Sequence, residues 1–477
     1  MSGVLQRRGV AAAEVIAELD ERAAGDADWR TGKMLMGLYD PGPGAHEVAL
    51  AAYTRFLAQN ALYINMYPSI ARMEQEVVAS VADLLRSDGE VVGNITSGGT
   101  ESILMAVKAS RDWARANRPH ITQPRIVVPI TAHPAFHKAA HYLGLRVVVT
   151  PVDTTGFRAD LEAFEKALGP DVILAVGSAP NFSHGTIDPI ARMAAAARER
   201  GVLFHVDGCV GGIYLSVMRR MGEKLPDFDF SVEGVTSISA DLHKYGYSPK
   251  NASVVLYRNR DLRRHAIFVC SGTTEYAVIN PTAQSSRTGG PVAAAWAILK
   301  HLGEEGFQQI VRDSQAATMR MLEGIEEIDG IHVLGDPEMC MFTLASDEVN
   351  IFEVDDEMRE RGWRLLPQFA CGGGPANLHV GISHGNVPHT EQFLTDLADV
   401  VGNLRRSGSS LDRSELAAAV AEVRDAPLEA ILMRIAPLAG LSGPDLPRRM
   451  AALNTMLDLL PAARRDELLT AYVNMTT

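Results

Sequence analysis

One lysine in this sequence lies where it could act as a nucleophile. Lys244 belongs to the segment Ser237–Gly246, which begins with an apolar, strand-like run. Burial there would lower the pKa of the lysine, and a desolvated lysine can form a Schiff base with an aldehyde. The alternative is an ordinary lysine in a solvated loop. Other residues in the sequence are needed to distinguish a nucleophilic lysine from a solvated one.

An aspartate stands at the end of another apolar run. Val202–Val206 is followed by Asp207 and Gly208. A carboxylate in a dry site can hold a proton on the nitrogen of a bound ring, because ion pairing there favours the charged form of both partners. Asp-Gly is also a common turn, which is the simpler interpretation of this residue on its own.

A glycine-rich turn opens a helical pattern earlier in the chain. The segment Asn94–Ser102 contains Gly98, Gly99 and Thr100, and an amphipathic pattern follows it. Glycines let the backbone approach a ligand closely, and the free N–H groups of a helix N-terminus bind anions. The alternative is a plain helix start, capped by Ser97 or Thr100.

Together these features are the parts of a site for pyridoxal phosphate (PLP). Lys244 follows Asp207 by 37 residues, which leaves room for a helix and the next strand. In such a site Lys244 is linked covalently to the cofactor, Asp207 keeps the pyridine nitrogen protonated, and the Gly98–Thr100 turn binds the phosphate. The cofactor then serves as an electron sink for a carbanion. We therefore predict PLP as the cofactor.

These residues need a scaffold that brings them together, and the hydrophobic pattern predicts one. Short runs rich in Val, Ile and Leu alternate with helical patterns from about Met73 onward. Such alternation predicts an α/β fold with a mostly parallel sheet, whose site lies at the carboxyl ends of the strands. The expected strands are Arg125–Ile130, Arg146–Thr150, Val172–Val176, Val202–Val206 and Val235–Ser239, and the clearest helices are Glu101–Ala116 and Pro189–Arg200.

The pattern divides the chain into four parts. We expect an N-terminal helical arm over 1–72, a PLP-binding large domain over 73–307, a smaller C-terminal α+β domain over 308–406 and a helical tail over 407–477. The smaller domain is predicted from the short strands Ile331–Leu334, Met341–Ala345 and Leu378–Ile382 and the helix Glu391–Arg405.

Charge and cysteine content narrow the partners and the compartment. With 45 Lys and Arg against 58 Asp and Glu, the net charge of −13 argues against nucleic acid or anionic lipid as the main partner. Cys209, Cys270, Cys340 and Cys371 are widely spaced, so we expect buried thiols rather than disulfides or a zinc site. No apolar run reaches the roughly 18 residues of a membrane span. These features predict a cytoplasmic protein.

Several motifs, in the same order, resemble segments of the sphingosine-1-phosphate lyases, which belong with the group II PLP-dependent decarboxylases. They are Thr96–Ala106, Ala132–Phe136, His205–Asp207, Gly234–Lys250 and Ser286–Gly290. The resemblance runs from about Gly32 to Gly335. It implies fold type I of the PLP enzymes and a homodimer with shared active sites, in which the N-terminal arm lies over the partner subunit.

The resemblance also implies further contacts with the cofactor. His133 matches the histidine that stacks on the pyridine ring, and Pro134 after it suits the first turn of a helix. His243 and Ser286 match positions that help to bind the cofactor phosphate. Ser286 would do so from a neighbouring subunit.

Three residues are candidates for contact with the substrate. Tyr39 and Lys250 match positions near the substrate's own phosphate, for which a phenol and a cation are suitable donors. Where family members carry a histidine in an Asn-Pro-Leu-His segment, this chain has Asn60–Tyr63, which makes Tyr63 the third candidate. The segments Gly272–Ala277 and Cys371–Pro375 also differ from the family pattern.

A metal site is the competing interpretation of one histidine cluster. His133, His137 and His141 are spaced by four residues and could align on a helix face. Pro134 places His133 at the start of that helix, and no carboxylate stands at a matching spacing. We therefore expect no metal.

The favoured function is a PLP-dependent carbon–carbon lyase. The resemblance implies retro-aldol cleavage of a phosphorylated sphingoid base, such as sphingosine 1-phosphate, to a long-chain aldehyde and phosphoethanolamine. The first alternative is decarboxylation of an L-amino acid, because the orientation of the substrate decides which bond breaks. The second is a cofactor-free scaffold, which the presence of Lys244, Asp207 and His133 disfavours.

Overall fold

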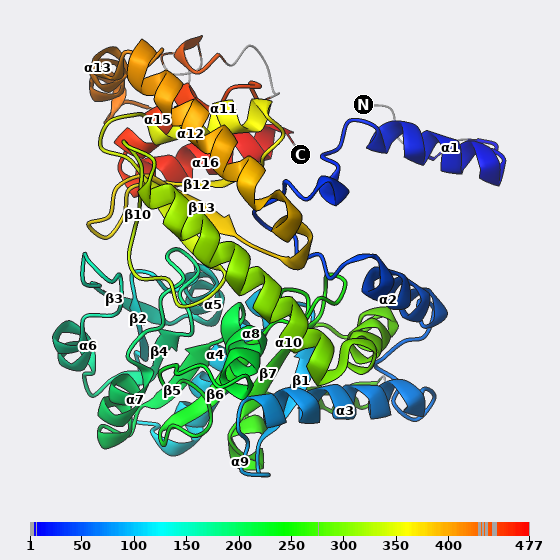
Figure 1. The fold of residues 1–477 in the computed structure, drawn as a ribbon. Coiled ribbons are helices and arrows are strands. Elements are labelled where there is room, and N and C mark those ends of the chain that lie inside the picture. Colours follow the sequence, from blue (N-terminus) through cyan, green and yellow to red (C-terminus); the bar gives the residue numbers. More distant parts are fainter. Residues whose placement is uncertain are drawn as a thin grey trace.

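A helical arm precedes the main body of the protein. The computed structural model describes residues 4–5, 7–274, 276–427, 431, 434, 437–440 and 446–476. In the arm, α1 (Ala12–Ala23) is followed by the 3-10 helix η1 (Trp29–Thr31) and by α2 (Pro43–Arg55), which begins with a proline as helices often do. No residue of α1 is buried, and this helix stands clear of the main body (Figure 1).

A seven-stranded sheet with the order β1-β7-β6-β5-β4-β2-β3 forms the centre of the fold. Its strands are β1 (Val92–Thr96), β2 (Arg125–Pro129), β3 (Arg146–Thr150), β4 (Val172–Ser178), β5 (Leu203–Asp207), β6 (Val235–Ala240) and β7 (Ser253–Tyr257). Neighbouring strands are parallel, except that β7 is antiparallel to β1 and β6. The predicted mostly parallel sheet is confirmed.

Helices cover both faces of this sheet, because successive residues of a buried strand point to opposite sides. Ile126 and Val128 of β2 share an apolar cluster with α4 (Gly99–Asn117) and α5 (Ala135–Leu143). Val127 belongs to the core of the other face. That face includes residues of α3 (Pro68–Leu84), α6 (Leu161–Ala167), α7 (Ile190–Glu199) and α8 (Gly211–Arg220), and the short α9 (Arg260–Arg263) follows β7.

A smaller antiparallel sheet occupies the second half of the chain. Its order is β10-β11-β13-β12, with β10 (His332–Val333), β11 (Met341–Ala345), β12 (Leu366–Gln368) and β13 (Asn377–Gly381). It is accompanied by α11 (Ile351–Glu360), the 3-10 helix η2 (His384–His389) and α12 (Thr390–Ser407). The predicted strands and helix of this part correspond to β10, β11, β13 and α12, whereas β12 and α11 were not among the expected elements.

One long helix, α10 (Gly290–Glu326), runs between the two sheets (Figure 1). Gly303 interrupts it with a φ of +56°, a conformation that favours glycine. Before the break, Nε1 of Trp296 donates to Glu76 of α3 at 2.6 Å, and after it Arg320 pairs with Glu391 of α12 at 2.8 Å. The domain boundaries predicted at 72/73 and 307/308 fall within α3 and α10, and the division into four parts stays a prediction.

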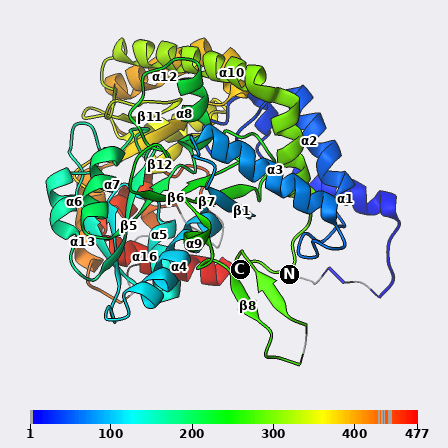
Figure 2. The same ribbon diagram turned by 90° about the horizontal axis from the view of Figure 1, so that it is seen from below.

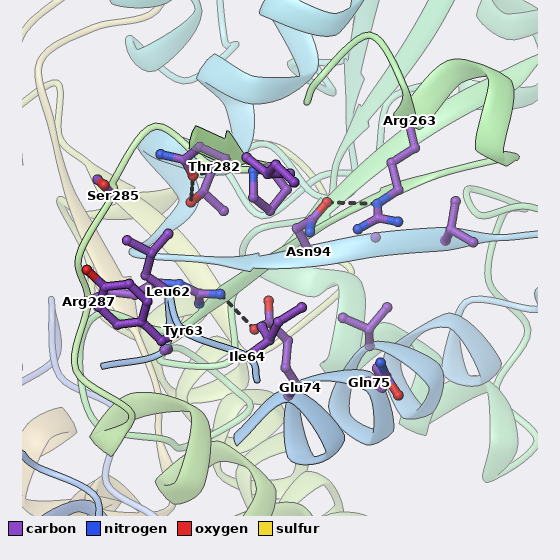
Figure 3. A pocket seen from close by; sticks show the side chains of 18 of the residues that line it. Leu62, Tyr63, Ile64, Glu74, Gln75, Asn94, Arg263, Thr282, Ser285 and Arg287 are labelled. Carbon is purple, nitrogen blue, oxygen red and sulfur yellow. Dashed lines mark hydrogen bonds and ion pairs between the residues drawn. The ribbon is translucent and has the colours of Figure 1, made fainter. Parts of the chain in front are cut away.

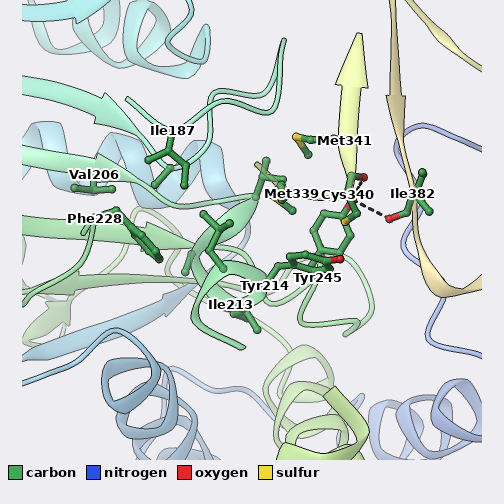
Figure 4. Packing of buried hydrophobic residues seen from close by; sticks show 14 of the residues in the cluster. Ile187, Val206, Ile213, Tyr214, Phe228, Tyr245, Met339, Cys340, Met341 and Ile382 are labelled. Atoms are coloured by element: carbon green, nitrogen blue, oxygen red, sulfur yellow. Dashed lines mark hydrogen bonds between the residues drawn. The ribbon is translucent and has the colours of Figure 1, made fainter. Parts of the chain in front are cut away.

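Buried tyrosines join the large sheet to the smaller one (Figure 4). Oη of Tyr245, in the loop after β6, lies 3.4 and 3.1 Å from the carbonyl oxygens of Cys340 and Ile382, to which it donates. Its ring meets the ring of Tyr214 edge on, with centroids 5.1 Å apart. These contacts hold the loop that carries Lys244 against the smaller sheet.

A two-stranded hairpin projects from the body (Figure 2). It consists of β8 (Phe268–Cys270) and β9 (Val278–Asn280), which pair antiparallel. Phe268, Val269 and Ile279 are exposed apolar side chains on it. Within the predicted departure 272–277 at its tip, Glu275 lies outside the described residues.

The C-terminal helices dock on α11. They are α13 (Arg413–Val423), α15 (Ala451–Leu459) and α16 (Ala462–Thr476), with an apolar cluster of their own. Asp356 of α11 accepts hydrogen bonds from the backbone N–H groups of Met450 and Ala451 at 2.8 and 2.9 Å. Of the predicted tail, residues 428–430, 432–433, 435–436, 441–445 and 477 lie outside the described part of the chain.

The cysteines differ in their surroundings. All four are free, and Cys209 and Cys340 are buried. Cys270 is half-buried and Cys371 is exposed, so the prediction of buried thiols is wrong for these two. Cys371 lies in a tight turn, where its backbone pairs with that of Gly374 and its side chain stays exposed. In the part of the chain that the structure describes, no helix is long and apolar enough to cross a membrane.

Candidate active site

A cavity of about 320 Å³ lies where β4 and β5 end and the loop after β6 begins. The start of α4 and the segment before α5 complete its walls. Seven of the residues predicted for the site surround it, namely Gly98, Gly99, Thr100, His133, Asp207, His243 and Lys244. Residues far apart in the sequence are thus brought together by the carboxyl ends of parallel strands.

The start of α4 offers backbone N–H groups to this cavity. No side chain caps the helix, so the capped start that the sequence allowed is not formed, and Gly98 has a φ of +150°. A Cβ on Gly98 would lie 3.1 Å from Cε1 of His243. A Cβ on Gly99 would lie 2.8 Å from both Oδ2 of Asp241 and Sγ of Cys209. The turn therefore has free donors, and it has no room for larger side chains at the glycines.

Glu101 ties this turn to the segment that leads to Ser286. Its Oε2 accepts a hydrogen bond from the backbone N–H of Ser97 at 2.6 Å. Its Oε1 accepts from the backbone N–H groups of Ala283 and Gln284 at 2.7 and 3.0 Å. Sequence reasoning missed this buried carboxylate, whose visible signal was an acidic residue in the first turn of a helix.

Asp207 is the last residue of β5 and is buried. Its Oδ1 accepts hydrogen bonds from the backbone N–H of Cys209 at 3.1 Å and from the hydroxyl of Ser239 at 3.4 Å. Both hydrogen bonds found for this carboxylate among the described residues use Oδ1. Oδ2 is therefore the oxygen that remains for a ligand.

His133 lies just before α5 and faces the cavity. Its Nδ1 accepts a hydrogen bond from the backbone N–H of Ala135 at 3.1 Å, so the ring proton belongs on Nε2. Burial lowers the pKa of His133, which favours the neutral ring. His137 and His141 are exposed on α5, and no group of three metal-binding side chains is found in the described ranges.

Lys244 forms an ion pair within the cavity. Its Nζ lies 3.0 Å from Oδ2 of Asp241, a buried carboxylate three residues earlier. Burial lowers the pKa of Lys244, but the attraction of the buried Asp241 carboxylate outweighs it and the net shift is upward. The predicted lowering of this pKa is therefore wrong, because the fold that desolvates the lysine also supplies its counter-ion. Asp241 itself had been given no role from the sequence.

His243 lies over the glycine turn. Its Nδ1 accepts a hydrogen bond from the backbone N–H of Ala252 at 3.2 Å, and its Nε2 lies 3.5 Å from Oδ2 of Asp241. Burial lowers the pKa of His243, with Asp241 opposing the shift. The ring is therefore oriented from both sides, with an N–H on Nε2.

Tyr39 and Lys250 lie together near Lys244. Nζ of Lys250 lies 5.1 Å from the ring centroid of Tyr39 and donates to the carbonyl of Gly37 at 2.9 Å. Burial raises the pKa of Tyr39 to about 12, although Lys244 opposes the shift, so this side chain is a neutral phenol. Its ring meets that of Tyr245, the neighbour of Lys244, edge on at 4.8 Å. A phenol and a cation thus stand together beside the lysine loop.

Tyr63 lies elsewhere, at a second cavity of about 970 Å³ (Figure 3), and both chain neighbours of Ser286 line the same cavity. Tyr63 lines this cavity, as do Ser285 and Arg287 on either side of Ser286. Oγ of Ser286 accepts a hydrogen bond from Nδ2 of Asn60 at 3.1 Å. Within one chain, neither of these two predicted site residues lines the cavity of Lys244.

The residues around the Lys244 cavity fit PLP. The helix start suits a phosphate, Asp207 suits a protonated ring nitrogen, and Lys244 suits an aldehyde. Oδ1 of Asp241 is buried without a hydrogen-bond partner among the described residues. Such an atom is costly unless a ligand group or water pairs with it.

Comparison with known sequences agrees with this fit. The profile of the pyridoxal-dependent decarboxylase conserved domain matches residues 41–344, and that of a C-terminal HTH domain of pyridoxal-dependent enzymes matches residues 414–475. The sphingosine-1-phosphate lyase of Arabidopsis thaliana is 40% identical over 400 residues, which are 82% of this chain and 72% of that protein. The "Probable L-tyrosine/L-aspartate decarboxylase" of Methanothermobacter thermautotrophicus is 31% identical over 75% of this chain and 94% of that protein.

Solved structures are similar as well. The sphingosine-1-phosphate lyase of Burkholderia pseudomallei K96243 superposes with a TM-score of 0.81 at 35% identity, covering 90% of this chain and 98% of that chain. The glutamate decarboxylase of Lactobacillus brevis has a TM-score of 0.75 over 86% of this chain and 96% of that chain, and at 18% identity it shows the fold alone. The predicted fold type I is thereby confirmed.

Proposed function

Since this chain belongs to the pyridoxal-dependent decarboxylase family, and within it to the sphingosine-1-phosphate lyases, we propose that it is a PLP-dependent lyase of phosphorylated sphingoid bases. Its substrate would be sphingosine 1-phosphate or a close analogue, and its products a long-chain aldehyde and phosphoethanolamine. The observation that carries the proposal is that Lys244, Asp207, His133 and the start of α4 surround one cavity in a chain with this similarity.

Each of these groups would hold a different part of the cofactor. The N–H groups at the start of α4 and the hydroxyl of Thr100 bind the phosphate. Asp207 holds the proton of the ring nitrogen, His133 stacks on the ring, and Lys244 makes the covalent link. When bound, PLP supplies an electron sink for a carbanion.

Asp241 would control the protonation of Lys244. The ion pair stabilises the ammonium form, which is not nucleophilic, so a proton must leave Nζ before this atom can bond to carbon. Because the carboxylate is buried next to Nζ, it keeps the side chain pointed into the cavity.

Tyr39 and Lys250 would bind the phosphate of the substrate. Lys250 supplies a charge and Tyr39 supplies a neutral O–H donor, and both stand beside the lysine loop. An anion held there fixes the direction from which the rest of the substrate enters the cavity.

The reaction breaks the bond between the amine-bearing and the hydroxyl-bearing carbon. The hydroxyl loses its proton and becomes the carbonyl of the aldehyde, while the amine-bearing carbon takes up a proton and remains in phosphoethanolamine. Positioning decides which bond of the substrate breaks, and here the phosphate contacts provide it.

A homodimer would complete the site. Ser286 and Tyr63 lie away from Lys244 within one chain, beside a surface with exposed apolar side chains, which is typical of an interface. Those side chains are Tyr63, Ile64, Met66, Tyr276 and Ile279. In mixed dimers of Lys244→Ala and Ser286→Ala chains, one site keeps both residues if Ser286 acts across the interface. Recovery of about a quarter of the activity on mixing is expected, and no recovery would contradict sharing.

Product analysis tests the proposed function. The PLP-loaded protein is incubated with sphingosine 1-phosphate, and mass spectrometry follows both products. Paired appearance of the aldehyde and phosphoethanolamine is expected, and its loss in Lys244→Ala. A PLP-bound protein that leaves the substrate intact would refute the proposal.

Decarboxylation is the second candidate, because an amino-acid decarboxylase is 31% identical over most of its own length. The same protein is therefore incubated with tyrosine, aspartate and other amino acids while carbon dioxide is measured. Release of carbon dioxide without cleavage of the phosphorylated base would favour this alternative. The cytoplasmic location stays a prediction from the sequence.

A further inference from the structure

A chain of buried polar side chains runs behind Asp207. His205, two residues before it on β5, is completely buried. Its Nδ1 lies 2.8 Å from Oγ of Ser237, and its Nε2 lies 3.2 Å from Oγ of Ser239, both on β6. None of these three side chains lines the cofactor cavity.

Ser239 is the link between this histidine and the carboxylate. Its hydroxyl donates to Oδ1 of Asp207 at 3.4 Å, and the thiol of Cys209 donates to the same hydroxyl at 3.1 Å. Strand pairing sets His205 beside Ser237 and Asp207 beside Ser239, so the side chains of each pair lie on one face of the sheet. The arrangement is therefore built into two central strands.

The directions of these hydrogen bonds follow from the groups involved. An ionised carboxylate can only accept, so the single proton of Ser239 points to Asp207. Nε2 of His205 must then donate to Ser239, and its Nδ1 must accept from Ser237. Burial lowers the pKa of His205 to about 4, which leaves the ring neutral and able to fill both roles.

All donors in this chain point the same way and end at one oxygen. Hydrogen bonds aligned in this manner polarise one another, and in a buried setting they stabilise the negative charge at the end. They also fix Oδ1, whose second donor is the backbone of Cys209. The other oxygen, Oδ2, remains for the ligand.

We propose that Ser239, oriented by His205 and Cys209, is a positioning residue that keeps Asp207 ionised and aims its free oxygen at the ring nitrogen of PLP. A proton shared between this carboxylate and the ring is then held on the ring, because the donor from Ser239 favours the charged carboxylate over the carboxylic acid. The inference rests on the proposed function, since it concerns the cofactor of that same site.

The test compares four proteins loaded with PLP that carries ¹⁵N at the ring nitrogen: the unaltered chain, Ser239→Ala, Ser239→Thr and Ser216→Ala. NMR reports whether the ring nitrogen is protonated, and visible absorbance reports PLP affinity. In Ser239→Ala the ¹⁵N resonance should move toward the unprotonated position, and PLP should bind about tenfold more weakly. Ser239→Thr keeps the hydroxyl and should stay closer to the unaltered chain than Ser239→Ala.

Ser216→Ala is the matched control. Ser216 is another completely buried serine, and its hydroxyl donates to the carbonyl of Gly212 rather than to Asp207. In Ser216→Ala, the ¹⁵N resonance of the PLP ring and the affinity for PLP should stay as in the unaltered chain. A ring nitrogen that stays fully protonated in Ser239→Ala would overturn the inference while leaving PLP binding, and with it the proposed function, intact.

A second measurement needs no variant at a buried strand position. In protein with ¹⁵N-labelled histidine, the tautomer of His205 should have its proton on Nε2 and none on Nδ1. The opposite tautomer would overturn the inference even if Ser239→Ala does not fold. Failure of the unaltered chain to bind PLP would count against the proposed function. The tautomer of His205 would still test the direction of the hydrogen bonds behind Asp207.

Discussion

Nζ of Lys244 and Oδ2 of Asp241 are 3.0 Å apart, in a part of the cavity where the carboxylate is shielded from water. The pair keeps the lysine charged and held in place, and it raises the pKa of Lys244 against the effect of burial. Lys244, which would make the covalent link to PLP, therefore lies next to the carboxylate that opposes loss of its proton.

Asp241→Asn should make uptake of PLP by the cofactor-free protein faster at neutral pH. Removing the carboxylate lowers the pKa of Lys244, so more of the nucleophilic amine is present, about tenfold for each unit by which the pKa falls. In the unaltered chain the uptake rate should keep rising into strongly alkaline solution, and in the variant the rise should end at lower pH. Growth of the visible absorption after PLP is added gives the rate at each pH. Asp261→Asn, at an exposed position of α9, should leave the profile unchanged.

Gly99→Ala should weaken PLP binding by about tenfold to a hundredfold. The added Cβ would lie 2.8 Å from Asp241 and Cys209, so the phosphate turn or the lysine loop must shift. Titration of the protein with PLP measures the effect. Gly44→Ala, where nothing lies within 4 Å of the added atom, is the control and should bind normally. Equal affinities for the two variants would speak against the turn as the phosphate site.

Glu101→Ala should loosen the segment before Ser286. Three backbone N–H groups lose their acceptor, and because Ala283 and Gln284 are exposed and can bond to water instead, each loss costs about 0.5–1.5 kcal/mol. Limited proteolysis should then cut near Ala283 and Gln284, and PLP affinity should fall. Glu162→Ala removes an exposed first-turn glutamate of α6 and should do neither. Unchanged protease resistance in Glu101→Ala would contradict the prediction.

Asp356→Ala should destabilise the docking of the C-terminal helices. The substitution removes the acceptor of two backbone N–H groups at the start of α15, for an expected loss of about 1–3 kcal/mol in the free energy of unfolding. Urea unfolding measures it. Glu360→Ala, which breaks an exposed ion pair with Arg448, should cost less than about 1 kcal/mol. A larger effect at Glu360 than at Asp356 would refute this account.

His379→Gln should flatten the fall in stability toward acid pH. Burial lowers the pKa of His379 to about 4, so the unfolded chain takes up a proton at higher pH than the folded chain. Proton binding thus favours unfolding, and the free energy of unfolding falls as the pH drops from about 6.5 to 4, by about 3 kcal/mol for this group. Melting temperatures of both proteins, measured from about pH 6.5 to 4, check the direction of this change in stability. His332→Gln, at an exposed residue of β10, should keep the slope of the unaltered chain.

Five strands of the large sheet, β2 to β6, could be predicted because each is an apolar run, whereas β1 and β7 were not among the expected strands. Val172–Val176, for example, corresponds to β4 with two more residues at its end. The direction of β7 could not be read in this way. β6 ends at Ala240 and β7 begins at Ser253, and the short connection between them contains no crossover helix, so the next strand returns antiparallel.

The counter-ion of Lys244 was harder to predict, although Asp241 lies in the same motif. Whether its side chain turns toward the lysine depends on the path of the loop, in which Tyr247 and Asn251 have φ values of +56° and +69°. Positive φ is uncommon for a tyrosine, and tertiary contacts enforce it here. Local sequence preference therefore carried no signal for this ion pair or for its effect on the pKa.

The helix α10 has a consequence for how such a chain can diversify. In its last part, the hydroxyl of Ser314 lies 2.8 Å from the hydroxyl of Tyr214 of α8. Asp313 lies 3.9 Å from His384 of η2, so every crossover point within the helix separates the partners of at least one of these contacts. Recombination between relatives that splices one lobe onto another would have to exchange the whole helix together with both of its docking surfaces. New specificities in this architecture are therefore more accessible through changes in the loops around the cavity than through exchange of its lobes.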